Sequence, residues 1–233
     1  MKLYFSPLAC SMVVRVVALE MGVSLVYEQV ELFAQTLTAD GTPYRASAPF
    51  GQVPLLVLED GSRLTEVAAI LALLADTRGA EQLLAPVGSL DRYRTLAWLG
   101  FSATEIHKRS LWPLANPRAP REAKEFGRRL AGEAFDHLET QLVGRRFIAT
   151  PGFSLADAHL GWALAVAPLL GADLGDRPAL RAYAARLAER PSFEAAFAAE
   201  MPLLRPAMKR QAAHLRPVPA AEPKASDKSE SVA

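Results

Sequence analysis

The pattern of apolar residues changes near residue 80, and this change constrains the fold more than any other feature of the chain. Before it, short strand-like runs alternate with segments of helical periodicity; after it, the patterned segments are helical. A chain of 233 residues, 51% of them apolar, can build the two cores that such a division needs. We therefore expect an α/β domain followed by an all-helical domain.

The first thirty residues predict a βαβ unit. Two strand-like runs enclose a segment with helical spacing, and the three lie at residues 3–5, 11–21 and 25–31. Gly22 ends the helical segment. A parallel pair of strands joined by a right-handed crossover is the expected result.

The next fifty residues predict a hairpin and a helix. Residues 55–59 and 63–65 flank an Asp-Gly pair at 60–61, which is typical of a tight antiparallel turn. A segment rich in Ala and Leu over residues 66–76 predicts a helix. Parallel and antiparallel pairs in one small sheet indicate a thioredoxin-like domain over residues 1–79.

The rest of the chain predicts helices. Residues 80–89 have the glycine and proline content of a linker. Helical segments follow at residues 91–112, 121–142, 155–169 and 178–190, with a last one over 193–201 that ends before Pro202 and Pro206. We expect an all-helical domain over 90–206. The tail at 217–233 has few apolar residues and is expected to be disordered.

Charge and hydropathy argue against several function classes. Lys and Arg number 26 against 25 Asp and Glu, so no global field favours nucleic acid or an anionic membrane. The most apolar stretch, residues 160–172, is shorter than the roughly 20 residues that cross a bilayer. Only Lys2 precedes a short apolar N-terminal segment broken by Pro7, unlike a signal peptide. We expect a cytoplasmic protein with no nucleic-acid or membrane partner.

Cys10 is the only cysteine, which excludes an internal disulfide and argues against a metal site. It precedes a predicted helix, where backbone N–H groups and the helix dipole favour a reactive thiolate. A buried, inert cysteine fits the position equally well. If the thiol is reactive, it lacks a second cysteine and can form a mixed disulfide only with an external thiol, which in cytosol points to glutathione.

Two further motifs flank the predicted hairpin. A cis Val53–Pro54 bond would turn the backbone of Val53 outward, where a peptide-like ligand could pair with it. The structural alternative is a proline at the first residue of a strand. Thr65 as N-cap and Glu66 in the first helical turn are explained by capping alone. The Glu66 carboxylate beside backbone donors also suits the ammonium and carboxylate of a γ-glutamyl group.

Together these motifs resemble beta-class glutathione transferases. The residues that carry the resemblance, between Met1 and about Pro206, are 1–7 with 9–11, 51–54, 64–66, 105–108 and 153–158. The resemblance implies a glutathione transferase fold and a homodimer. It also implies glutathione as cosubstrate, with a small hydrophobic electrophile as the second substrate.

The resemblance also implies the site residues. Cys10, close to the glutathione sulfur, and His107 would be catalytic, although His107 alone is more typical of a helix surface. The residues that would bind glutathione are Ala9, Gln52, Val53, Pro54, Glu66, Val67, Glu105 and Lys108. The Ser154–Asp157 pair is a capping box to which we assign no catalysis.

Two other functions stay open. One is glutathione-dependent reduction of disulfides or peroxides, or dehalogenation. The shape of an apolar pocket, which the sequence does not show, would decide among these reactions. The other is a non-catalytic binding or regulatory protein that keeps the scaffold. Departures from the family pattern that remove polar contacts or add bulk support this last reading, at Ala48, Phe50, Val67 and Gly100.

Overall fold

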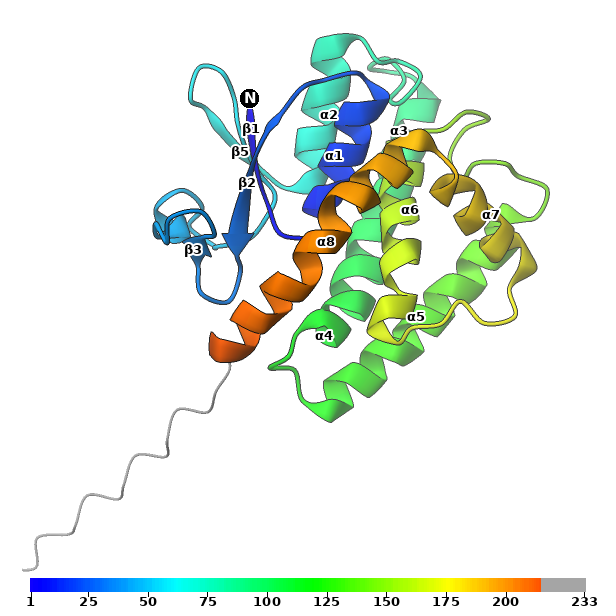
Figure 1. Ribbon diagram of the computed structural model, residues 1–233. Helices are drawn as coiled ribbons and strands as arrows, with labels where there is room; N and C mark the ends of the chain where they lie inside the picture. Colours follow the sequence, from blue (N-terminus) through cyan, green and yellow to red (C-terminus); the bar gives the residue numbers. More distant parts are fainter. Residues whose placement is uncertain (215–233) are drawn as a thin grey trace, which may run out of the picture.

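The computed structural model describes residues 1–214 and has two parts (Figure 1). A mixed sheet with two helices forms the N-terminal part, and a bundle of helices forms the rest. The predicted architecture, an α/β domain followed by an all-helical domain, is confirmed. The tail predicted to be disordered, 217–233, lies outside the described residues.

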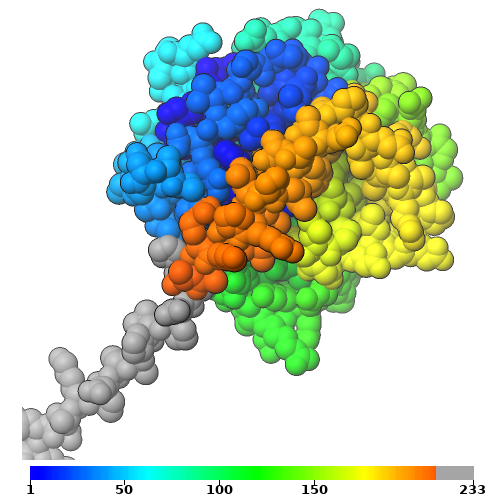
Figure 2. Space-filling model, in the orientation of Figure 1, coloured from blue at the N-terminus to red at the C-terminus, as the bar shows by residue number. Residues whose placement is uncertain are grey.

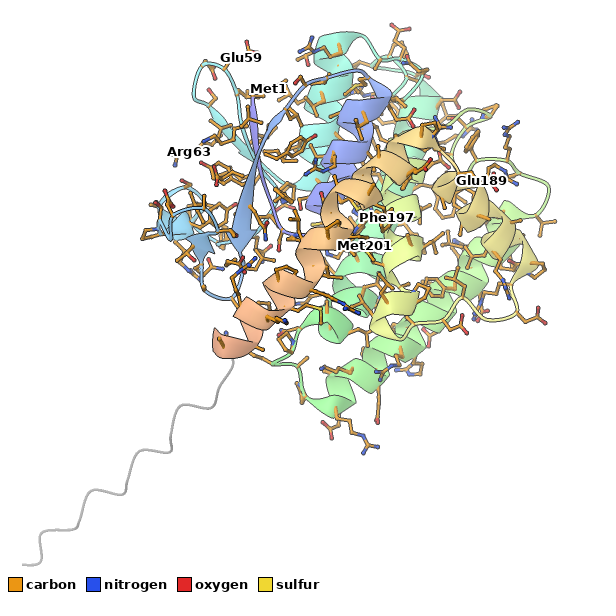
Figure 3. The ribbon with its side chains drawn as sticks, viewed as in Figure 1. Met1, Glu59, Arg63, Glu189, Phe197 and Met201 are labelled. Carbon is orange, nitrogen blue, oxygen red and sulfur yellow. The ribbon has the colours of Figure 1, made fainter. Side chains whose placement is uncertain are left out.

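Five strands form one sheet in the order β3-β2-β1-β4-β5. Their bounds are β1 (Lys2–Phe5), β2 (Val26–Glu31), β3 (Thr36–Leu37), β4 (Leu55–Val57) and β5 (Arg63–Thr65). β1 and β2 are parallel and joined through α1 (Ser11–Glu20), as predicted. β4 and β5 form the predicted antiparallel hairpin, with Glu59 and Arg63 near its turn (Figure 3).

The two faces of the sheet pack against different elements. Neighbouring strand residues point to opposite faces, so Leu56 joins the core shared with α1, whereas Leu55 packs with Val30 and Tyr44. Tyr44 begins η1 (Tyr44–Ala46), a short helical turn. α2 (Val67–Arg78) packs against α1 and ends at Gly79, whose left-handed conformation is typical of a helix C-cap.

The helical part contains eight elements. They are α3 (Leu90–Phe101), η2 (Ser102–Leu111), α4 (Trp112–Ala115), α5 (Arg121–Leu142), α6 (Leu155–Val166), η3 (Pro168–Leu170), α7 (Pro178–Ala188) and α8 (Pro191–His214). The first three follow one another without a break where the sequence predicts one helix, but the middle stretch, η2, is π-helical. In the part of the chain described, no helix combines the length and the apolarity that a membrane crossing requires.

The last helix is longer than predicted. Our prediction that it ends before Pro202 is wrong, because α8 continues through Pro202 and Pro206 to His214. Each proline removes one backbone donor from the helix. Both lie on the exposed side of α8, so water can satisfy the carbonyl groups that lose their partners.

The two parts share an extensive contact. α8 crosses the boundary between them and packs on α1, with Phe197 and Met201 along its length (Figures 2 and 3). The predicted linker is also anchored, because Leu83 and Leu84 are buried and the Leu83 carbonyl accepts a hydrogen bond from the Leu155 N–H at 3.0 Å. The boundaries 1–79, 80–89 and 90–206 stay predictions.

Candidate active site

Cys10 lies where the loop after β1 enters α1, directly beside the segment that precedes β4. Its Sγ donates a hydrogen bond to the Val53 carbonyl oxygen over 3.5 Å. The Val53–Pro54 peptide bond is cis, which is the first of the two alternatives considered from the sequence. Ala9 packs on the small apolar cluster that contains Val53. The structure thus brings Cys10, Ala9, Val53 and Pro54 together.

The Cys10 thiol is buried, with only 8% of the residue exposed. Burial raises its pKa to about 12, while the Lys108 charge and the backbone N–H groups of Cys10 and Ser11 act in the opposite direction. The predicted effect of the helix start is therefore present, but desolvation outweighs it. Of the two alternatives that the sequence left open, the structure shows the buried cysteine, because Cys10 packs into the core beside α1.

Lys108 joins the two parts of the molecule at this point. Its Nζ donates to Gln52 Oε1 over 3.3 Å, and it lies 5.4 Å from the Trp112 ring centroid. The Gln52 carbonyl oxygen accepts a hydrogen bond from Tyr44 Oη at 2.9 Å. The segment before Pro54 is therefore fixed from both sides, with a cation of the helical domain close to the thiol.

Glu66 occupies an unusual backbone conformation at the start of α2. Its φ is 68°, in the left-handed region that non-glycine residues rarely adopt. Our prediction of Thr65 as N-cap is wrong: Thr65 pairs with Leu55 in the sheet, and Glu66 takes the N-cap position. The Glu66 charge raises the pKa of Cys10, so this carboxylate, followed by Val67, faces the same region as the thiol.

His107 is half-buried on η2, in contact with the aromatic rings of α6. Its ring packs edge-to-face on Trp162, with 4.9 Å between centroids. Burial lowers its pKa to about 3, and His159 and Lys108 act in the same direction. His107 is therefore neutral at physiological pH.

Glu105, which was predicted to bind glutathione, has a carboxylate that contacts residues of its own helix instead. Its carboxylate pairs with Arg109 and accepts a hydrogen bond from Thr104 Oγ1, both on its own helix. Among residues 1–214 there is also no group of three His, Cys, Asp or Glu side chains that could hold a metal ion.

Sequence reasoning missed the contacts that hold the loop before Cys10. The N–H of Leu8 donates to Glu200 Oε2 at 2.8 Å, and the Leu8 carbonyl accepts from Trp162 Nε1 at 3.0 Å. Glu200 also pairs with Arg15 at 2.9 Å. Both partners of Leu8 lie more than 150 residues away in the chain. The available signal was an acidic residue at helical spacing from Phe193 and Ala196, on the apolar side of α8.

Comparisons with known proteins agree with this architecture. The family model described as "Glutathione S-transferase, N-terminal domain" matches residues 9–77, and "Glutathione S-transferase, C-terminal domain" matches residues 103–191. Glutathione S-transferase GstA of Escherichia coli O157:H7 is 38% identical over 200 residues, which cover 86% of this chain and 98% of the relative.

Solved structures give the same result. A sphingomonad glutathione S-transferase complexed with glutathione is 38% identical, with a TM-score of 0.80 and 86% and 98% of the two chains covered. The beta-class glutathione S-transferase of Sphingomonas chungbukensis is 34% identical, with a TM-score of 0.81 and coverage of 86% and 98%. On the strength of these matches, its fold and the motifs around Cys10, the chain belongs to the glutathione S-transferase family.

Proposed function

We propose that the protein binds glutathione along Val53 and uses it to conjugate or reduce small hydrophobic electrophiles. The observation that carries the proposal is the contact between the Cys10 thiol and the Val53 carbonyl oxygen. It places the only sulfur nucleophile of the chain beside a backbone segment that an extended peptide could pair with. Family membership and the glutathione complex of a relative support the choice of ligand.

The two ends of glutathione would meet different features around Cys10 and Val53. The γ-glutamyl group would bind at the start of α2, with Glu66 facing its ammonium group and the Val67 N–H donating to its carboxylate. The strained φ of Glu66 supports a functional role, because such strain gathers at ligand sites. Gln52 and Lys108 would contact the peptide from the opposite side, whereas Glu105 would have to leave Arg109 in order to take part.

The protonated state of Cys10 favours conjugation over disulfide exchange. A thiol with a pKa of about 12 is a poor nucleophile at neutral pH, but it can donate its hydrogen bond to a neighbouring sulfur anion. The N–H groups at the start of α1 and the Lys108 ammonium would stabilise the same anion. Glutathione, held as a thiolate by these donors, would attack the electrophile, with neutral His107 as a further polar group.

Exposed apolar residues support the proposal of a homodimer. Phe50 is 86% exposed beside the glutathione segment, and Val87, Leu90 and Tyr93 are exposed around the start of α3. Exposed apolar side chains of this size are typical of protein interfaces. Sedimentation velocity of the native protein and of Phe50→Ser would test it.

The cytoplasm, which contains reduced glutathione, is the compartment that this function requires.

Replacement of Cys10 by Ala tests the proposal directly. We expect conjugation of an aryl halide to fall, and reduction of a glutathione mixed disulfide to be low already in the native protein. Equal conjugation rates in Cys10→Ala and native protein would remove Cys10 from the mechanism. Dominant disulfide-reductase activity would favour the reductase alternative. A calorimetric titration with no heat at millimolar glutathione would favour the non-catalytic one.

A further inference from the structure

The π-helical stretch η2 places two polar side chains against the same residue of α6. Residues five apart lie on different sides of an α-helix with 3.6 residues per turn, but on one side of a π-helix. Ser102 and His107 are five apart, and both approach His159. Ser102 Oγ lies 2.7 Å from His159 Nδ1, and the His107 and His159 ring centroids are 6.0 Å apart.

His159 has one buried nitrogen without a protein partner. The residue is fully buried, and among the residues that the structure describes none forms a hydrogen bond with its Nε2. Trp162 lies beside both rings, but its Nε1 already donates to the Leu8 carbonyl oxygen. A buried polar atom without a partner is costly, so it usually marks the position of a bound water or of a functional group.

The partner of Ser102 determines which nitrogen of His159 carries the proton. Ser102 Oγ forms one hydrogen bond within the described residues, to His159 Nδ1, and its direction depends on the His159 tautomer. A hydroxyl that accepted here would leave its own buried proton without a partner, so we take Ser102 as the donor. In neutral His159 the proton then lies on Nε2, which is a donor. The adjacent His107 ring is 6.0 Å away between centroids, too far for a direct bond in this orientation but within reach through one water.

We propose that Ser102 and His159 are positioning residues that fix the orientation and tautomer of His107 through one bridging water. His159 Nε2–H donates to the water, and the water donates to the inner ring nitrogen of His107. The outer nitrogen of His107 then carries the proton and is the hydrogen-bond donor available to the proposed glutathione site. This inference rests on the proposed role of His107 in the cleft, and no proton is transferred in it.

The charged and titratable groups around His107 are compatible with this arrangement. Burial opposes a positive charge on His107, and His159 of α6 and the Lys108 cation of its own helix lower its pKa further. The relay therefore keeps His107 in one neutral tautomer over the physiological pH range. If Ser102 or His159 is removed, water gains access and the His107 pKa moves toward its usual value.

Three variants test the relay. Ser102→Ala and His159→Phe remove its two members, whereas Ser102→Thr retains the hydroxyl and serves as the conservative rescue. His137→Phe is the matched control, because His137 stacks on Trp98 and packs at a tilt against Phe101, away from His159. Each is compared by nitrogen-15 NMR of histidine-labelled protein and by kcat and KM for conjugation between pH 5 and 8.

We expect one neutral tautomer for His107 in the native protein, Ser102→Thr and His137→Phe. Ser102→Ala and His159→Phe should show mixed tautomers, a kcat lower by roughly two- to tenfold, the range of one hydrogen bond, and an acid limb that moves toward pH 6. KM for glutathione should be unchanged. Unaltered His107 signals in both Ser102→Ala and His159→Phe would overturn the proposal.

The role of His107 itself is tested separately. If His107→Phe conjugates at the native rate, the proposed role of His107 fails, although the NMR coupling between Ser102 and His107 can still be present. If His107→Phe is impaired, Ser102→Ala should add no further loss in that background. An additive loss would mean that Ser102 acts on some other group, and the relay would be wrong.

Discussion

The helix starts near Cys10 differ from those elsewhere in the molecule. α6 begins with a complete capping box, in which Asp157 Oδ2 accepts from the Ser154 N–H at 2.9 Å and the Ser154 side chain caps the helix in return. α3 begins with Ser89, which accepts from the Asp91 N–H. By contrast, α1 and α2 have no side-chain cap from any described residue. Cys10 is the N-cap residue of α1, and the charge of Glu66 at the start of α2 acts on the Cys10 thiol.

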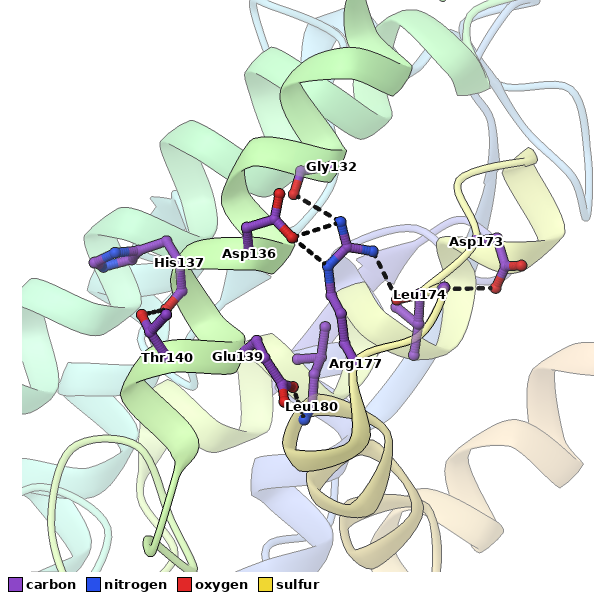
Figure 4. Close-up of polar contacts among 10 residues, drawn as sticks. Gly132, Asp136, His137, Glu139, Thr140, Asp173, Leu174, Arg177 and Leu180 are labelled. Carbon is purple, nitrogen blue, oxygen red and sulfur yellow. Dashed lines mark hydrogen bonds and ion pairs between the residues drawn. The ribbon is translucent and has the colours of Figure 1, made fainter.

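The start of α7, far from Cys10 in the sequence, is also capped by a side chain. Its first donors are capped by a residue of another helix: Glu139 of α5 accepts from the Ala179 N–H at 3.1 Å and the Leu180 N–H at 2.7 Å (Figure 4). Arg177, just before α7, pairs with Asp136 of α5 in the same view. The start of α7 therefore needs no ligand.

The comparison teaches where an anionic ligand can bind. Backbone donors at a helix start must be satisfied by side chains, water or a ligand. α5 also lacks a side-chain cap within the described range, but Arg121 and Glu122 are exposed there, so water can satisfy its donors. At the start of α1 the N–H groups of Met12 and Val13 already donate to the carbonyl oxygens of Ala9 and Cys10. The start of α2 therefore supplies most of the donors that we propose for glutathione.

We expect the largest effect on stability from removing the capping box at the start of α6. Asp157 also accepts from the Ile148 N–H at 3.0 Å and from Tyr183 Oη at 2.6 Å. Asp157→Ala leaves these buried donors without a partner, so we expect the free energy of unfolding to fall by about 3–5 kcal/mol. Urea denaturation measures it. If the folded fraction of Asp157→Ala also bound glutathione more weakly, helix starts that are capped by side chains would not have a structural role alone.

The sequence predicted the start of α6 correctly because the capping box is local. Ser154 and Asp157 are three residues apart, and both partners can be read from one short segment. The burial of Cys10 could not be read in this way, since its neighbour Val53 is 43 residues away. The relation of Leu8 to Glu200 and Trp162 has the same origin: long-range packing, rather than local propensity, decides it.

The π-helix and the orientation of His107 show a second limit. The periodicity of residues 91–112 predicts a helix but cannot distinguish 3.6 residues per turn from the wider π turn. Gly127 of α5 is the residue that allows a close approach here, because an added Cβ would lie 2.7 Å from the Ser110 carbonyl oxygen. Only the fold shows this contact, and with it the side of η2 that faces α6.

The second prediction concerns the reactivity of the thiol at the start of α1. A pKa of about 12, well above that of an ordinary thiol, makes the thiolate scarce at pH 8. We expect alkylation of native Cys10 by iodoacetamide to be at least about a hundredfold slower than in urea-unfolded protein. Because the thiolate fraction grows with pH below the pKa, the native rate should rise about tenfold per pH unit up to roughly pH 11.

Lys108→Met sharpens this test, since the Lys108 charge lowers the Cys10 pKa. Alkylation of Cys10 in this variant should be slower still at each pH. Arg121→Met, on the exposed start of α5, is the matched control and should leave the rate unchanged. A native rate that levels off near pH 7 would mean that the helix start, not burial, controls the thiol.

The third prediction separates binding from stability at the start of α2. Glu66→Gln should weaken glutathione binding by roughly tenfold, because it removes a charge-assisted contact. Its free energy of unfolding should change by less than about 0.5 kcal/mol, because Glu66 occupies the N-cap position but its side chain forms no capping hydrogen bond. Calorimetry with glutathione and urea denaturation measure the two effects.

Glu66→Gly adds the backbone to this comparison. Glycine adopts a positive φ without strain, so this variant should bind glutathione as weakly as Glu66→Gln while relieving strain of about 1 kcal/mol. A loss of stability in both variants, with unchanged binding, would show that Glu66 is structural and that the start of α2 is not a ligand site.

The smallest expected effect is at Ser89, the cap of α3. Ser89→Ala removes one hydrogen bond of 3.3 Å, a long bond at a half-exposed position, so the loss of stability should lie near the lower end of the usual range, about 0.5–1 kcal/mol. Glutathione binding and kcat should not change, because this helix start lies outside the cleft. The two variants should therefore have opposite effects: Ser89→Ala lowers stability without changing binding, and Glu66→Gln weakens binding without changing stability. If Ser89→Ala reduced glutathione affinity at unchanged stability, the division between structural and ligand-binding helix starts would not hold.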